Sequence, residues 1–423
     1  MLVAPSRRIQ LSDPVNPAWV VILLYVAFLA SGLLARKWPV DTDGHPVIID
    51  YLSMWAAGRL ALAGHAAAAY DWTAHKAIEV TAVGHDFATY ASWFYPPAFF
   101  FATAPFALLP FAPSLLAWNT VGLGLALIAV GKVIPRRAPL ILAAIATPVV
   151  LWNATLGQNG CLSAALIAGA LALVERRPVI AGALIACLTF KPQLGILLPV
   201  ALVCGGYWRT FMTAAVGTAL LVVASLAVFG ADAWAAFLGS IGLAKQTILV
   251  DTAIGAAKLE SAFGLMRLLG GSTDIAWTAQ LLVATPVVAL VGWLWRSSAP
   301  LDLKAAALAA GTALVTPYVL IYDLVILVVP IAFLARSGLS KAETLAVAAA
   351  GILLFARALT DVPLGLAASV IVGGVVLVRI LRSGPLAITI RPQQRHDLRL
   401  LGLRRGRTGA TAAGGLHGKA ERG

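Results

Sequence analysis

Apolar segments of about 18 or more residues recur along the whole chain, separated by short polar stretches. Each segment, wound as a helix, is long enough to cross a hydrocarbon layer roughly 30 Å thick. Strands of membrane β-barrels alternate apolar and polar residues, and these segments do not. Because helices and closed barrels are the two ways for a backbone to satisfy its hydrogen bonds in lipid, the sequence predicts an all-α polytopic membrane protein.

Composition agrees with this prediction. Hydrophobic residues make up 60% of the 423 residues and charged residues 12%, whereas a soluble domain is about half apolar and about a quarter charged. The three cysteines, Cys161, Cys187 and Cys204, all lie in apolar sequence, as buried small residues do. Cysteine and histidine do not cluster with the spacing of a zinc site, so we expect neither a metal nor another cofactor.

We expect a bundle of about 12 transmembrane helices between residues 18 and 382. The first segment has no small-residue cleavage motif, so it is interpreted as a retained span rather than a signal peptide. Within 95–133, residues 95–111 are expected to dip into the membrane beside one full span. The expected crossings are 18–35, 95–133, 139–156, 159–174, 178–190, 192–207, 210–229, 278–295, 304–318, 320–335, 342–358 and 363–382.

Lysine and arginine are distributed asymmetrically between the two sides of this bundle. If the N-terminus is cytoplasmic, 22 of the 31 basic residues fall on the cytoplasmic side, and acidic residues concentrate on the other. The positive-inside rule then places both termini, 1–17 and 383–423, in the cytoplasm. The second of these is a basic tail that we expect to be disordered. The net charge of +13 therefore reflects membrane orientation, and we expect no nucleic-acid partner.

Two long loops, 36–94 and 230–277, are expected on the outer side. Both contain short apolar stripes at helical spacing, which predict amphipathic helices lying on the outer membrane face. Asp71, in the first loop, has the position of a helix N-cap.

Polar patches interrupt the apolar sequence, and in this topology all of them fall at the outer face. Polar side chains at membrane depth are costly and usually mark a functional cavity. The candidate site residues in these patches are Asp50, Tyr95, Gln158, Asn159, Lys191, Gln193, Tyr318, Tyr322 and Asp323.

Each patch also has a structural interpretation. Asp50 could cap a helix or act as a general base with a raised pKa, and the two are compatible. Tyr95 could belong to an interfacial aromatic belt or touch substrate. Gln158 and Asn159 stand in a Gly-flanked turn, where an amide also suits hydrogen bonds to sugar hydroxyls.

Lys191 and Asp323 are the two charges that need most explanation, because long apolar runs flank them. The lysine could extend to the interface, or it could provide a fixed positive charge for the phosphate of a leaving group. The aspartate requires a partner or a wet cavity, and Lys191 is a candidate partner in a purely structural ion pair.

In this order the patches resemble glycosyltransferase family 87, a bacterial group once catalogued as a domain of unknown function. The matching elements cover roughly residues 45–335. They are Asp50 with Ala56-Ala57 and Gly64 through Tyr70-Asp71; Tyr95-Pro96-Pro97 with Pro105 and Leu109-Pro110; Gly157-Gln158-Asn159; Lys191-Pro192-Gln193; Glu260-Ser261 before Phe263-Gly264; and Thr316-Pro317 through Tyr322-Asp323-Leu324 to Pro330.

The resemblance implies a GT-C fold in the bacterial cytoplasmic membrane, with the active site at the outer face. It implies inverting transfer of a sugar, commonly mannose, from a polyprenyl-phosphate donor to a lipid or glycan acceptor. It also assigns Asp50 as the base and Lys191 as the lysine that follows the Gly-Gln-Asn motif. Characterised actinobacterial mannosyltransferases carry histidines near the end of the Thr-Pro motif, where this chain has Tyr322-Asp323.

A transporter or flippase of a lipid-linked sugar is the alternative function. Such a protein is expected to place charges near the bilayer midplane and to show related halves. This chain gathers its polar groups at one face and has no evident half-repeat, which favours the glycosyltransferase.

Overall fold

The computed structural model describes residues 17–34, 48–88, 92–134, 146–246, 249 and 256–384. Every regular element in these ranges is a helix, as the apolar pattern predicts. Five predicted features lie wholly or partly outside the described residues. They are the cytoplasmic N-terminus to residue 16, the stretch 139–145 of the third expected crossing, the stretches 36–47 and 89–91 of the first long loop, residues 247, 248 and 250–255 of the second, and the basic tail from residue 385.

Four helices are long and apolar enough to cross a membrane by length and composition. They are α5 (Phe111–Val133), α12 (Trp208–Phe229), α15 (Thr273–Arg296) and α19 (Leu364–Arg382). Another 18-residue helix, α1 (Pro17–Leu34), begins the described chain. The prediction of about 12 transmembrane helices is therefore not confirmed, although an all-helical chain with candidate membrane spans is.

Shorter helices occupy most of the other expected crossings, because prolines and polar residues end them early. The segment 192–207 divides into α10 (Pro192–Gly195) and α11 (Leu197–Gly205), and 320–335 divides into the 3-10 helix η6 (Ile321–Leu327) and α17 (Val328–Arg336). The remaining short helices are α7 (Pro148–Leu156), α8 (Gly160–Leu173), α9 (Pro178–Cys187) with η3 (Leu188–Phe190), α16 (Leu301–Val315) and α18 (Lys341–Ala356) with η7 (Arg357–Leu359).

The segment 95–133 contains one long helix rather than two. It begins with η2 (Pro97–Phe99) and the short α4 (Phe100–Ala107), and then continues as the 23-residue α5. Pro110 separates α4 from α5 because its ring lacks the N–H that an uninterrupted helix would use.

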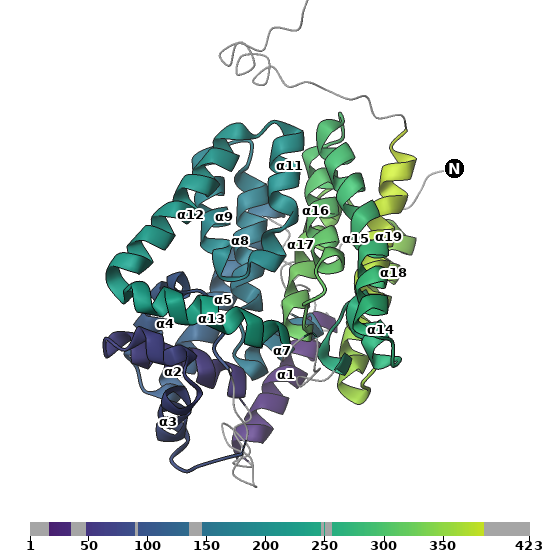
Figure 1. The fold of residues 1–423 in the computed structure, drawn as a ribbon. Coiled ribbons are helices and arrows are strands. Elements are labelled where there is room, and N and C mark those ends of the chain that lie inside the picture. The colour runs from purple at the N-terminus through teal and green to yellow at the C-terminus, as the bar shows by residue number, and fades with distance from the viewer. Residues whose placement is uncertain are drawn as a thin grey trace, which may run out of the picture.

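Helices from both long loops gather at one end of the bundle (Figure 1). The first loop gives α2 (Ile49–Leu62), η1 (Ala66–Tyr70) and α3 (Trp72–Val83), and the second gives α13 (Ala231–Lys245), η5 (Ala256–Lys258) and α14 (Ala262–Leu268). In Figure 1, α13 runs across the more upright helices, and it packs against η1. The sequence pattern predicted helices in both loops, and they are present.

The prediction of a helix with a single apolar face is wrong for α2. Nine of its 14 residues are buried, because α2 packs closely against α4. A β-carbon placed on Gly58 would stand 2.7 Å from the β-carbon of Ala107, and that close approach requires glycine. Asp71 is confirmed as the N-cap of α3, where its carboxylate accepts a hydrogen bond of 2.8 Å from the Ala74 N–H.

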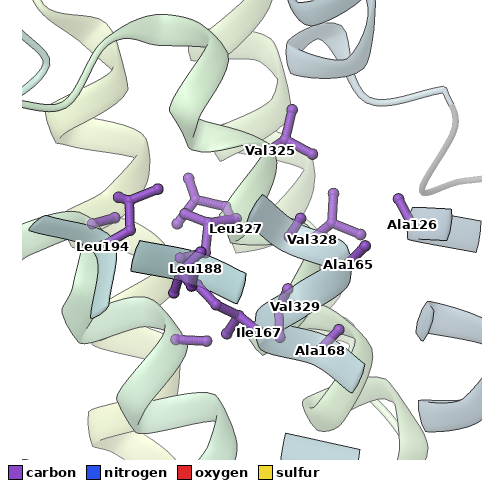
Figure 2. Packing of buried hydrophobic residues seen from close by; sticks show 14 of the residues in the cluster. Ala126, Ala165, Ile167, Ala168, Leu188, Leu194, Val325, Leu327, Val328 and Val329 are labelled. Carbon is purple, nitrogen blue, oxygen red and sulfur yellow. The ribbon is translucent and has the colours of Figure 1, made fainter. Parts of the chain in front are cut away.

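The apolar core holds the polar breaks in place. Figure 2 shows Leu188 of η3 and Leu194 of α10 beside Leu327 of η6, with Ala165 and Ala168 of α8 nearby. The short η3, α10 and η6 are thereby fixed against longer helices. The backbone can leave the α-helical path at Lys191 and at 316–320 while its neighbours remain packed.

Candidate active site

Lys191 and Asp323 form a buried ion pair. The Lys191 Nζ lies 2.5 Å from Asp323 Oδ1, and the two residues are 3% and 1% exposed. The ammonium also lies over the Tyr322 ring, 5.0 Å from its centroid. The ion pair considered from the sequence is therefore present, whereas extension of the lysine to the interface is wrong because Lys191 is buried.

Local backbone chemistry explains why these charges meet. Lys191 stands between η3 and α10, and Pro192 begins α10 because proline is well suited to a first helical position. Asp323 lies in the first turn of η6, where its second carboxylate oxygen accepts a hydrogen bond of 3.1 Å from the Leu320 N–H. The carboxylate is therefore oriented by the backbone before it meets the lysine.

The amides of Gln158 and Asn159 form a second cluster with Tyr95. The Asn159 Nδ2 donates to the Tyr95 hydroxyl at 2.9 Å, and this hydroxyl donates to Gln158 Oε1 at 3.4 Å. The Asn159 N–H also donates to Gln158 Oε1, at 3.2 Å. The Oδ1 of Asn159 is buried without a hydrogen-bond partner, so an acceptor oxygen remains available to a ligand that donates a hydrogen bond.

Two glycines bring this loop against its neighbours. Gly157 has φ +64°, and a β-carbon there would stand 2.5 Å from the β-carbon of Tyr51. A β-carbon on Gly160 would stand 2.1 Å from the carbonyl oxygen of Tyr322. The glycines thus allow α2 and η6 to approach the loop between α7 and α8. The sequence correctly predicted a turn at Gly157. It did not predict that both glycines also permit close tertiary packing.

Asp50 reaches the same place from α2. Its side chain is hydrogen-bonded to Gln158, and Lys191, Lys258 and Asp323 lie within electrostatic range of its carboxyl group. Burial raises the pKa of Asp50 above its ordinary value, and this effect outweighs the Gln158 hydrogen bond and the two lysines, which lower the pKa. The N-cap interpretation of Asp50 is wrong, because the N-cap of α2 is Ile48 and Asp50 lies in the first turn.

Two of the three remaining candidates, Tyr318 and Tyr322, lie beside the residues described above, and Gln193 lies apart from them. Tyr318 lies in the 316–320 break and is near enough to Tyr95 and Asp50 to interact with them electrostatically. Tyr322 is buried beside Lys191. Gln193 is half-buried in α10, and no hydrogen bond found among the described residues joins it to the other candidates. The structure therefore brings together every candidate except Gln193.

A cavity of about 220 Å³ lies beside the amide cluster. Gln158 and Asn159 contribute to its wall, and most of the remaining lining is apolar and comes from α4, α5 and α8. Among its lining residues, Phe101, Val121 and Leu125 are also exposed on the outside of the bundle. The cavity therefore extends from polar groups of the site to a lateral apolar surface.

Sequence reasoning missed Lys258, which lies close enough to Asp50 to affect its charge. The signal available was its place two residues before Glu260-Ser261, but nothing local connects it with Asp50. It also missed Asn153, whose Oδ1 accepts a hydrogen bond from the Cys161 N–H at 3.3 Å and helps to fix the loop. Across the described ranges, no group of three or more His, Cys, Asp or Glu side chains could hold a metal ion.

Comparison with known proteins identifies a family for this chain. The sequence model of glycosyltransferase family 87 matches residues 93–317, which is more than half of the chain. This range contains Tyr95, Gln158, Asn159 and Lys191, whereas Asp50 and Asp323 lie outside it. No curated protein and no solved structure matches the chain significantly.

Proposed function

The chain belongs to glycosyltransferase family 87, and we propose that it transfers a hexose, with mannose as the first candidate, from a polyprenyl-phosphate carrier to a lipid or glycan acceptor. Its family supports glycosyl transfer as the class of reaction. The four long apolar helices support a location in a membrane. The proposed location is the outer face of the bacterial cytoplasmic membrane, with both termini in the cytoplasm.

The observation that carries the proposal is the meeting of Asp50 with Gln158 and Lys191, which come from three separate segments. Together they supply a carboxylate, an amide and an ammonium. Inverting transfer from a sugar phosphate requires a base for the acceptor, hydrogen bonds for the sugar and positive charge for the departing phosphate. The cluster contains one group for each requirement.

In the proposed reaction, the Asp50 carboxylate takes the proton of an acceptor hydroxyl. The acceptor oxygen forms a bond to the anomeric carbon while the bond from that carbon to the phosphate oxygen breaks. The electron pair of the broken bond stays on the phosphate, which leaves as polyprenyl phosphate. A single displacement of this kind inverts the configuration at the anomeric carbon.

Lys191 would stabilise the phosphate as its negative charge grows. An ammonium has three N–H donors, and the pair with Asp323 uses one of them. The other two remain for phosphate oxygens or a neighbouring group. Asp323 would then act by fixing the ammonium, and Tyr322 by covering one side of it.

The sugar would be held by the amide cluster and the tyrosines around it. Asn159 Oδ1 is buried and has no hydrogen-bond donor. A sugar hydroxyl that donates to this oxygen would relieve the free-energy cost of a buried, unsatisfied acceptor. Tyr95, Tyr318 and Gln158 would contribute further polar contacts. Gln193 remains a candidate for the acceptor side, because it lies apart from the rest.

The lateral cavity supports a carrier that is a lipid. Its apolar wall begins at Gln158 and Asn159 and reaches the outside of the bundle. A polyprenyl chain could leave the site through this cavity and enter the surrounding hydrocarbon. Its methylene groups would then stay out of water, where each would cost about 0.8 kcal/mol.

The test is incubation of the purified protein with a panel of polyprenyl-phosphate hexoses and a membrane lipid extract. Release of polyprenyl phosphate together with a glycosylated product supports the proposal. The matched control is Asp50→Asn, which has nearly the same size and cannot accept the proton. Movement of the intact donor across a vesicle bilayer without bond cleavage would instead indicate a flippase.

A further inference from the structure

The charges around Asp50 nearly cancel, and one lysine decides the balance. Lys191, Lys258 and Asp323 are charged side chains that lie within electrostatic range of Asp50. Lys191 is neutralised by Asp323 at 2.5 Å. When Asp50 is ionised, as its role as base requires, leaving out Lys258 sets two carboxylates against one ammonium, and this net negative charge would repel an anionic substrate. With Lys258 the net charge of these four groups is zero.

We infer that Lys258, an exposed residue next to the buried Leu259 that packs against Tyr322, binds the phosphate of the lipid-linked donor together with Lys191. This inference rests on the proposed function, because it names the residue that recognises the donor phosphate. The chemical class recognised is a phosphate mono- or diester on a lipid chain.

The backbone next to Lys258 is firmly anchored. Leu259 is fully buried and packs with Leu320 and Tyr322 in one apolar cluster. The Glu260 N–H donates to the Val319 carbonyl oxygen at 2.8 Å, so the segment after η5 is joined to the 316–320 break. The backbone at Lys258 is therefore anchored beside the site through the contacts of Leu259 and Glu260.

The side chain of Glu260 adds a second anchor. Its carboxylate is paired with Arg357 Nε at 2.5 Å and accepts a hydrogen bond of 2.8 Å from the Gly365 N–H. These contacts connect the segment to η7 and to the first turn of α19. The anchoring restricts where the Lys258 stem begins and leaves its ammonium exposed and able to reach a ligand.

Phosphate chemistry explains why a second cation is needed. The donor phosphodiester carries one negative charge, and cleavage of the glycosidic bond gives the leaving phosphate another. Lys191 cannot meet this demand alone because Asp323 already neutralises it. An exposed lysine can follow the phosphate from donor to product, since its stem is flexible and its ammonium has three donors.

The experiment measures binding of polyprenyl monophosphate and of polyprenol with the same chain length to the full-length purified protein. The ratio of the two dissociation constants isolates recognition of the phosphate from binding of the lipid. Lys258→Gln should reduce the preference for the phosphate by about tenfold, a moderate value for the loss of one close charge. Lys258→Arg should retain most of it.

The matched control is Lys245→Gln. Lys245 is an exposed lysine at the end of α13 in the same long loop, and it is not among the charges that act on Asp50. Its variant should keep the wild-type preference. A Lys258→Gln preference equal to the wild type, or an equal loss in Lys245→Gln, would overturn the inference.

This binding assay does not depend on sugar transfer. If the wild type transfers sugar but Lys258→Gln keeps the phosphate preference, the proposed function stands and the role of Lys258 is wrong. If no polyprenyl-phosphate sugar is used but the preference falls in Lys258→Gln, Lys258 is supported as a phosphate ligand and the proposed function fails.

Discussion

Removal of one member of the Lys191–Asp323 pair should destabilise the protein more than removal of both. The variants are Lys191→Met, Asp323→Asn and the double variant. Methionine keeps the length of the lysine stem without the charge. Asparagine keeps an oxygen that can accept the hydrogen bond from Leu320 N–H, so the substitution removes the charge and little else.

The expected size follows from burial of the pair. Both residues are almost fully buried, and breaking a buried ion pair by removing one partner costs about 3–5 kcal/mol. In Asp323→Asn, the Tyr322 ring still faces the ammonium and offsets about 0.5–2 kcal/mol of that cost. The loss is therefore nearer 3 kcal/mol for Asp323→Asn and nearer 5 kcal/mol for Lys191→Met, as order-of-magnitude values.

The double variant has no unpaired charge, and replacement of a buried pair by neutral groups is often close to neutral. We expect it to lie within about 2 kcal/mol of the wild type, although the two single losses sum to about 8 kcal/mol. The difference is a coupling energy of roughly 6 kcal/mol. All three variants should lack transfer activity, because each has lost the fixed ammonium or the group that fixes it.

The assay is the free energy of unfolding in mixed micelles, measured by denaturant titration for the wild type and the three variants, with transfer rates measured in parallel. Additive losses in the double variant would show that the two charges do not stabilise each other. Single losses below about 1 kcal/mol would place the pair among solvated surface ion pairs and refute the reasoning. A stable double variant with full activity would remove Lys191 from the proposed mechanism.

Three other changes test separate parts of the proposal. Asp50→Asn should lower kcat by about 10²–10⁴-fold. In the wild type, kcat should rise with pH above the ordinary aspartate range, because burial raises the pKa of Asp50 and its ionised form is the base. A pH–rate profile that still rises in Asp50→Asn would refute this role of Asp50. Gly160→Ala should destabilise the protein by about 1–3 kcal/mol and abolish transfer, because the new β-carbon would stand 2.1 Å from the Tyr322 carbonyl oxygen. The control in the same melting and activity assays is Gly124→Ala, where a β-carbon has open space. Equal effects of the two substitutions would contradict the packing argument. Gly122→Leu should fill the lateral cavity and raise KM several-fold for donors with long lipid chains but little for donors with short ones. The measurement is steady-state kinetics with a series of donor chain lengths. An equal KM change at every chain length would show that the carrier lies elsewhere.

Local chemistry in the sequence was sufficient to predict the helices and several of their ends. The apolar segment at 210–229 is helix α12, which begins at Trp208 and ends at Phe229. Asp71 was recognised as a cap because capping depends on one side chain and the next turn of backbone. The polar breaks were also visible, since a lysine or an Asn-Gly pair is conspicuous in apolar sequence.

The number of long spans and the role of α2 could not be obtained in this way. A short apolar helix has the same composition whether lipid or protein surrounds it, so hydropathy alone does not give the number of spans. In the same way, α2 is buried on most sides because Gly58 admits α4, and its stripe of apolar residues gave no sign of this contact.

The sequence by itself therefore determined a helical membrane chain with polar residues at its breaks, because hydrophobic period and turn chemistry are local properties. Only the tertiary structure decided which of those residues meet. Lys191 and Asp323 are 132 positions apart, and Lys258 comes within electrostatic range of Asp50 from another loop. Contacts of this kind depend on how helices pack, through close approaches such as that of Gly160 to Tyr322, and no local pattern in the chain specifies them.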